Sequence, residues 1–240
     1  MRAVVAGLVL LLGAAPAAAA EITAYDVTVR SQLTGPARVE ARIEIAAPSP
    51  GDVLVPVGFA TADALQAQEV PAGVTLTLER PDGAPLLRIG VPAGTPSPLA
   101  VTFTFSISPA LPVPVVAAGE RATLPGGSRV ARHAFVNTQP LRIARYTCLF
   151  VMPGGMRVHA IREALPRLGK TEVGPRVRLV DVEGLAGARL AAGPLRQGDS
   201  TSMQVEAVPR ARPWGLLAAG VLLSVAYLVY FRDLVAPPRA

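Results

Sequence analysis

The chain has 240 residues, a net charge of +6 and a mean hydropathy of +0.42, yet only 5% of its residues are aromatic and 17% are charged. High hydropathy with so few aromatic residues indicates membrane-directed segments that raise the average. A single cysteine excludes a disulfide scaffold and a four-cysteine metal site, and 22 glycines with 24 prolines exclude a helical bundle.

Residues 1–20 have the pattern of a secretory signal peptide. Arg2 supplies a positive charge, Ala3 to Ala15 form an apolar core, and three alanines provide an A-x-A cleavage site before Glu21. The apolar core is short for a membrane span, and an uncleaved N-terminal anchor is the alternative. We therefore start the fold prediction at residue 21 and expect the following chain to be exported.

Alternation of apolar and polar residues dominates residues 21–209. It is clearest at 39–45, 74–79, 101–107 and 202–207, and weaker strands are predicted at 22–32, 53–59, 86–92, 129–137, 141–152, 156–162 and 176–182. Glycine- and proline-containing turns separate these runs, so we expect an all-β fold of one or two antiparallel immunoglobulin-like β-sandwich modules. Two helical turns are the expectation for residues 61–69, with Thr61 as their cap and Pro71 as their stop.

A proline-rich stretch at 109–114 lies near the middle of this region, and the charge balance changes there. Residues 21–118 hold five basic and nine acidic residues, whereas residues 119–209 hold thirteen and seven. We predict a β-sandwich module at 21–112 and a second, basic β-sandwich module at 113–209. One larger sandwich is the alternative.

Soft metal ligands gather within twelve residues of the second module. Cys148, Met152, Met156 and His159 span a strand, a Pro-Gly-Gly turn and the next strand. Thiolate, thioether and imidazole groups suit Cu(I), which makes this a candidate copper site. Core packing is the simpler interpretation, because alternate residues of the first strand are apolar. We therefore expect neither a metal nor a cofactor.

Arginines are spread through the second module, including Arg176 and Arg178. Stacking aromatics are missing beside them and the segment is expected outside the cytoplasm, so nucleic acid is not a predicted partner. Anionic lipid headgroups or an acidic protein surface fit the charge better. Dispersed solvated arginines are the alternative.

Residues 214–231 contain 18 consecutive uncharged residues between Arg212 and Arg232. With aromatics at both ends, this pattern predicts a single transmembrane helix and a short cytoplasmic tail at 232–240. Arginine outnumbers lysine 22 to 1, a bias typical of GC-rich bacterial genomes. We therefore predict a single-pass inner-membrane protein with most of the chain in the periplasm, and the bilayer as one partner.

Gly220, Ser224 and Tyr227 share one face of this predicted helix. A small-xxx-small face allows close approach of a second helix, so these residues form a candidate membrane-helix interface. Passive anchoring is the alternative.

Sequence motifs of hydrolases, zinc proteases, phosphate loops and dinucleotide-binding folds are missing. We therefore expect a non-enzymatic binding or scaffolding subunit of a bacterial envelope complex, with a membrane or periplasmic protein as partner. A periplasmic copper-handling protein and an envelope hydrolase with a distributed site that includes His133 or His159 are the alternatives. The layout broadly resembles bacterial single-pass envelope proteins with immunoglobulin-like modules, but no stretch is specific to one family.

Overall fold

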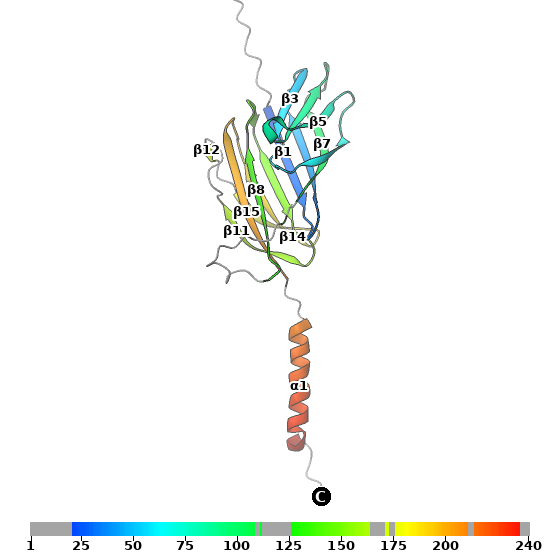
Figure 1. The fold of residues 1–240 in the computed structure, drawn as a ribbon, viewed down its shortest axis with the longest axis vertical. Coiled ribbons are helices and arrows are strands. Elements are labelled where there is room, and N and C mark those ends of the chain that lie inside the picture. Colours follow the sequence, from blue (N-terminus) through cyan, green and yellow to red (C-terminus); the bar gives the residue numbers. More distant parts are fainter. Residues whose placement is uncertain are drawn as a thin grey trace, which may run out of the picture. The chain divides into compact units, whose positions relative to one another are not determined.

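The computed structural model describes residues 21–108, 111, 126–163, 171–172, 176–210 and 214–235. Contacts divide the chain into a β-rich unit that ends at Val208 and a C-terminal unit that starts at Pro209. Figure 1 shows the β-rich unit as a stack of twisted sheets. The predicted signal peptide at 1–20 and the predicted module boundary at 112/113 lie outside the described residues, and both stay predictions.

The large sheet contains eight strands in the described part of the chain. Seven follow one another in the order β13-β14-β10-β1-β2-β7-β4, and β9 pairs with β1 at one end. Their bounds are β1 (Glu21–Arg30), β2 (Ala37–Ile45), β4 (Asp63–Glu69), β7 (Leu99–Ile107), β9 (Arg142–Ile143), β10 (Tyr146–Val151), β13 (Arg176–Val182) and β14 (Leu185–Ala192). Strands from both predicted modules therefore belong to one sheet.

This sheet is mixed, so the prediction of antiparallel immunoglobulin-like modules is wrong. β1 runs antiparallel to β2 but parallel to β10, with Val27 opposite Cys148. The short strand β9 is also parallel to β1. Parallel neighbours need a long crossover, which the intervening chain supplies here. Alternation along a strand indicates its two faces but not its neighbour or its direction, which is why the sequence did not reveal this pairing.

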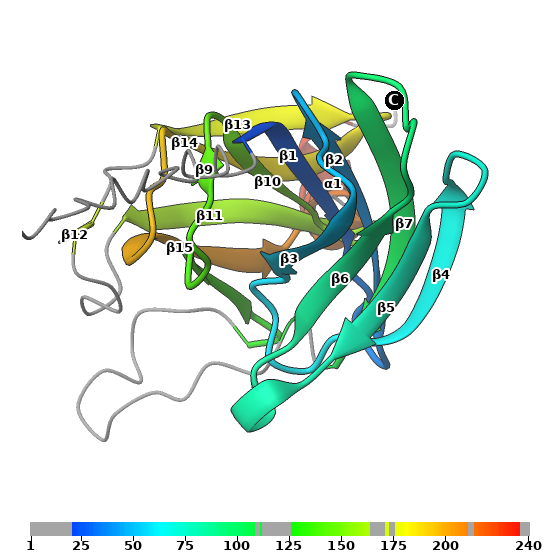
Figure 2. The ribbon, with the colours of Figure 1, turned by 90° about the horizontal axis from the view of Figure 1, so that it is seen from above.

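Two smaller sheets form the second layer against the large sheet (Figure 2). One contains β11 (Met156–Glu163), β15 (Asp199–Pro209), β12 (Thr171–Glu172) and β8 (Arg129–Val136), with β15 paired to β8. The other has the order β3-β6-β5, formed by β3 (Gly51–Pro56), β6 (Leu86–Val91) and β5 (Thr75–Glu79), and a 3-10 turn at Pro81–Gly83 precedes β6.

The core lies between these layers, and β2 illustrates how the sequence builds it. Val39, Ala41 and Ile43 are buried, whereas the alternating Arg38 and Glu40 are exposed on the outer face. Tyr25 of β1 contacts Phe135 of β8 edge to face, with ring centroids 5.8 Å apart. Burial of these apolar faces, at roughly 25 cal/mol per Å², holds the sheets together.

The segment predicted as a helix at 61–69 forms strand β4 instead. β4 pairs with β7 at the edge of the large sheet, and an irregular register follows Asp63, where Ala64 has a φ of 53°. The Thr61 hydroxyl accepts the backbone N–H of Ser108 at 3.1 Å and caps no helix. Alanine, leucine, glutamine and glutamate favour helices only weakly, and hydrogen bonding to β7 outweighs that preference.

The C-terminal unit contains one helix, α1 (Trp214–Val235). Among the residues that the structure describes, no helix combines the length and the apolar character needed to cross a bilayer. The predicted transmembrane helix at 214–231 and the single-pass inner-membrane location are therefore corrected. The uncharged run is shorter than the ~20 residues usual for a span, and α1 continues through Arg232 and Asp233.

Candidate binding site

Strand β13 forms one edge of the large sheet, and its only strand neighbour among the described residues is β14. Figure 2 shows this β13–β14 pair at the margin of the large sheet, while β4 lies at the opposite margin. The outer row of backbone N–H and C=O groups on β13 therefore lacks a strand partner in the described part of the chain. Such an edge is suited to receive an added strand.

Three arginines lie together on the outer face of this edge, and we call Arg176, Arg178 and Arg189 the arginine strip. Arg178 on β13 is directly opposite Arg189 on β14, and Arg176 shares the face of Arg178 because it is two residues away. All three are exposed, and none forms an ion pair within the described residues. Like charges opposite one another destabilise a sheet, so an anionic partner here would relieve a repulsion.

The opposite face of β13 carries Val177 and Leu179, with Asp181 towards the turn, and it is incompletely covered. Val177 is opposite the buried Leu190, and Leu179 is opposite the buried Ala188, so both point to the core side of the sheet. Leu179 nevertheless remains 66% exposed. The edge therefore presents positive charge on one face and an uncovered leucine on the other.

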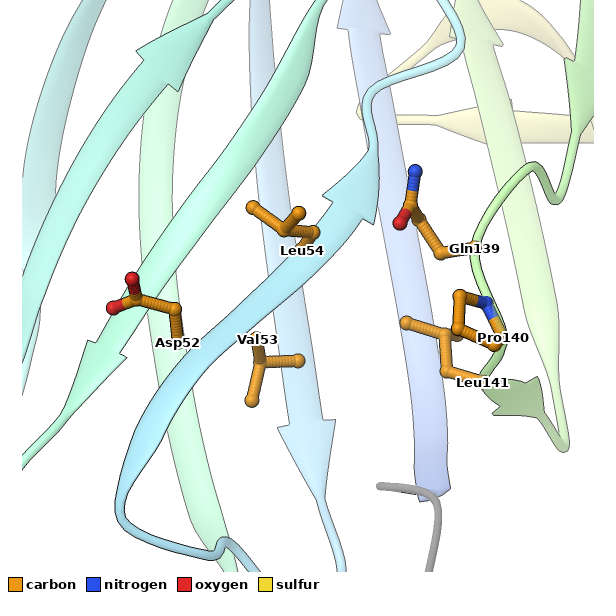
Figure 3. Close-up of a pocket in the computed structure, with 6 residues that line it drawn as sticks. All are labelled: Asp52, Val53, Leu54, Gln139, Pro140 and Leu141. Carbon is orange, nitrogen blue, oxygen red and sulfur yellow. The ribbon is translucent and has the colours of Figure 1, made fainter.

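A pocket of about 230 Å³ lies between β3 and residues 139–141 (Figure 3). Asp52, Val53 and Leu54 come from β3, on the other side of the pocket from Gln139, Pro140 and Leu141, and the Asp52 carboxylate points away from Gln139. Asp52 supplies the one carboxylate among the lining residues, and its Oδ2 atom lies 2.5 Å from Nη1 of Arg88. The Nε atom of Arg88 also lies 2.6 Å from Oε1 of Glu79. The volume lies below the ~300 Å³ of typical ligand pockets, and Arg88 neutralises the charge of Asp52. This pocket is therefore the weaker candidate.

Polar groups also meet inside the core, around His133 on β8. The Nε2 atom of His133 lies 2.7 Å from the hydroxyl of Tyr146 on β10. Burial lowers the pKa of His133 to about 3 and raises the pKa values of Tyr146 and Cys148. Histidine, tyrosine and cysteine are therefore all uncharged at neutral pH. Because solvent does not reach them, the cluster acts in packing rather than in binding.

The structure distributes the proposed copper ligands over different environments. Cys148, Met152 and Met156 are buried, whereas His159 is exposed on β11. Met156 and His159 are three residues apart on one strand, so their side chains point to opposite faces. The raised pKa of Cys148 favours the protonated thiol, while metal binding needs the thiolate. The described residues contain no group of three or more His, Cys, Asp or Glu side chains placed to hold a metal.

The predicted helix interface lies on α1, where Gly220, Ser224 and Tyr227 are all exposed. The Ser224 hydroxyl donates to the carbonyl oxygen of Gly220 at 2.9 Å, within the same helix. A Cβ added at Gly220 would meet no atom within 4 Å. Contact of this face with a second helix stays a prediction, although its assignment to a membrane span is corrected.

Sequence reasoning named Arg176 and Arg178 but missed Arg189, because it did not predict β14. The signal for this strand was the dipeptide Glu183-Gly184 between two apolar runs. Val182 pairs with Leu185 across this two-residue connection, and both central residues have positive φ, at 55° and 80°. These values fit a type I′ hairpin turn, for which glycine at the second position is a recognisable cue.

No family model and no curated protein matches the chain. Solved structures are similar at low identity. They include a "putative protease" from Parabacteroides distasonis (8% identity, TM-score 0.43) and two structures of leukotriene A4 hydrolase from Saccharomyces cerevisiae (7% and 10% identity, TM-scores 0.44 and 0.43). The matches cover 78–79% of this chain but only 40% of the first structure and 29% of each of the others.

Proposed function

We propose that this chain is a non-catalytic binding module that receives an extended acidic segment of a partner protein along β13. One observation carries the proposal: Arg176 and Arg178 of the arginine strip and the exposed Leu179 lie on opposite faces of one edge strand. Addition of a strand to a sheet edge derives affinity from main-chain hydrogen bonds and specificity from alternate side chains. The edge of β13 offers both.

The two faces of β13 specify the partner's sequence pattern. Side chains of an added strand alternate between the faces of the sheet, as those of β13 do. Residues on the outer face would lie beside Arg176 and Arg178 and should be acidic. Residues on the inner face would lie beside Leu179 and should be apolar. The expected partner segment therefore alternates acidic and apolar residues.

Binding of a synthetic peptide of alternating glutamate and valine to the full chain tests this proposal. Fluorescence anisotropy should detect binding that weakens as salt is added, because exposed charges are screened. Replacement of both Arg178 and Arg189 by Glu should weaken binding by at least about tenfold, the cost of losing hydrogen bonds to charged groups. Arg38 is exposed on the same face of the large sheet, so Arg38→Glu is the matched control and should bind normally.

Two further peptides separate strand addition from simple charge attraction. A peptide of the same composition with its glutamates and valines in separate blocks keeps the charge but loses the alternation. A peptide with N-methyl groups on alternate residues keeps the side chains but cannot form ladder hydrogen bonds. Both should bind weakly. Equal binding of all three peptides, or full binding to the doubly substituted protein, would contradict the proposal.

A further inference from the structure

A second pocket, of about 480 Å³, lies at one end of the large sheet, and we call it the loop pocket. The lining comes from residues 30–34 at the end of β1, residues 151–154 at the end of β10, and Leu185 at the start of β14. Its volume falls in the range of roughly 300–1,000 Å³ that is usual for small-molecule sites. It uses none of the residues of the arginine strip.

The walls of the loop pocket combine apolar side chains with one positive charge. Leu33 is 47% exposed, whereas Val151 and Met152, which also line the pocket, are buried. Arg30 supplies the guanidinium group. Ser31 donates its backbone N–H to Val151, while its buried hydroxyl has no hydrogen-bond partner among the described residues. A rotation about χ1 would allow this hydroxyl to donate to a ligand.

The ion pair between Arg30 and the rest of the protein is weak. Its Nη1 atom lies 3.4 Å from a carboxylate oxygen of Glu183, and both side chains are largely exposed. Ion pairs of this kind contribute little to stability and are readily exchanged. Glu183 also has a φ of 55°, a conformation that glycine and asparagine adopt more easily than glutamate. The backbone conformation of the turn therefore does not favour glutamate at position 183. The carboxylate of Glu183 nevertheless reaches Arg30.

We propose that the loop pocket binds an organic carboxylate with an apolar tail, and that Glu183 occupies Arg30 until this ligand arrives. The ligand carboxylate would replace that of Glu183 on Arg30 and accept the Ser31 hydroxyl. Its apolar tail would cover Leu33. A fatty acid and the apolar C-terminal residue of a peptide share this chemistry.

Titration calorimetry on the full chain with octanoate and with N-acetyl-leucine tests the proposal. At least one should bind, and acetate and N-acetyl-leucinamide, which lack the tail or the charge, should bind at least about tenfold more weakly. Tighter binding of octanoate assigns the site to fatty acids, and tighter binding of N-acetyl-leucine assigns it to peptide C-termini. Failure of both ligands to bind overturns the proposal.

Three substitutions identify the site. Arg30→Gln should weaken binding by about tenfold, whereas Glu183→Gln should strengthen it severalfold because the internal competitor is lost. Arg38→Gln is the matched control, because Arg38 is directly opposite Arg30 in the sheet and does not line the loop pocket. Both arginine variants should retain the wild-type melting temperature, since both residues lie at the surface. Equal affinities for wild type and Arg30→Gln, or weaker binding by Glu183→Gln, would overturn the assignment.

Discussion

The Nε2 atom of His133 and the hydroxyl oxygen of Tyr146 lie 2.7 Å apart inside the core. His133 is 1% exposed, its Nδ1 atom has no hydrogen-bond partner among the described residues, and its ring packs 4.7 Å from that of Phe59. Burial lowers the pKa of His133 to about 3. The fold therefore requires a neutral histidine, whereas the unfolded chain protonates it near its ordinary pKa of about 6.5.

This difference makes the stability of the β-rich unit depend on pH. The contribution of neutral His133 is complete above pH 6.5 and is lost as the pH falls towards 3, because only the unfolded state takes up the proton. The free energy of unfolding should decrease by roughly 2 kcal/mol between pH 6.5 and pH 5 from this group. Urea unfolding at several pH values measures it. His133→Phe should flatten this decrease, and an unchanged slope would assign the acid sensitivity to other groups.

Tyr25 provides a contrasting case, because its buried hydroxyl has no hydrogen-bond partner among the described residues. Its ring contacts those of Phe135 and Tyr146. Tyr25→Phe keeps the ring and removes the unsatisfied group, so it should stabilise the fold by about 1 kcal/mol. Tyr146→Phe deprives His133 of its partner and should destabilise by about 1–3 kcal/mol. Thermal unfolding of the two variants checks the opposite signs, and equal losses would refute this view of Tyr25.

The alternating pattern predicted most strands at their observed positions. Residues 101–107 lie in β7 and residues 202–207 lie in β15, because burial of one face of a strand requires this pattern. The pattern could not reveal that β1 runs between β2 and β10, since the pairing of β1 with β10 joins residues more than 100 positions apart. The prediction of a helix at 61–69 was wrong for a related reason. The composition of this segment favours a helix, but pairing with β7 provides hydrogen bonds as a strand.

The candidate site was less predictable than the fold. The sequence identified a basic half that contains Arg176 and Arg178, but it did not place Arg189 opposite Arg178. It also grouped His159 with the sulfur-containing residues, because closeness in sequence does not show which face of a strand a side chain occupies. Alanine and glycine are frequent in β14, and such residues carry little strand signal, so the partner of β13 was missed.

Gly58 is required by the packing around His133. It has a φ of 77°, and a Cβ atom added there would lie 2.8 Å from Cδ2 of Phe135. Gly58→Ala should destabilise the fold by about 2–4 kcal/mol, from backbone strain and overpacking together. Gly35 has a similar φ of 85° but no atom within 4 Å of an added Cβ, so Gly35→Ala should cost only about 1 kcal/mol. If both variants lose the same free energy of unfolding in chemical denaturation, overpacking against Phe135 does not contribute to the loss.

Asn137 holds the segment that forms one wall of the pocket in Figure 3. Its buried side chain donates to the carbonyl oxygens of Leu141 at 2.7 Å and Leu195 at 3.3 Å, and it accepts the N–H of Gln139 at 3.2 Å. Asn137→Ala should destabilise by about 2–3 kcal/mol, because buried polar groups lose their partners. Hydrogen exchange of the Gln139 amide should also accelerate. Thr138→Ala, an exposed neighbour, is the control and should change stability by less than about 0.5 kcal/mol.

At Arg178 and Arg189, we expect the same substitution to raise the stability of the fold and to weaken peptide binding. The two side chains are directly opposite on β13 and β14, and neither has an ion-pair partner among the described residues. Arg189→Glu converts a like-charge pair into an attractive one, so it should stabilise the β-rich unit by about 0.5 kcal/mol at low salt. The same change should weaken binding of the alternating acidic peptide, because it places a carboxylate on the face that the glutamates must approach.

Placing the carboxylate on β13 instead of β14 tests whether the pair itself is responsible. Arg178→Glu should reproduce both results, since either substitution leaves one positive and one negative residue in the pair. Unfolding experiments with and without added salt should show that screening removes the gain in stability. If either variant is less stable than the wild type yet binds the peptide equally well, the arginine strip is not a binding surface, and its repulsion is balanced by other contacts in the fold. A gain in stability together with a loss of binding would mean that the chain retains an unfavourable arginine pair because a partner's carboxylates neutralise it.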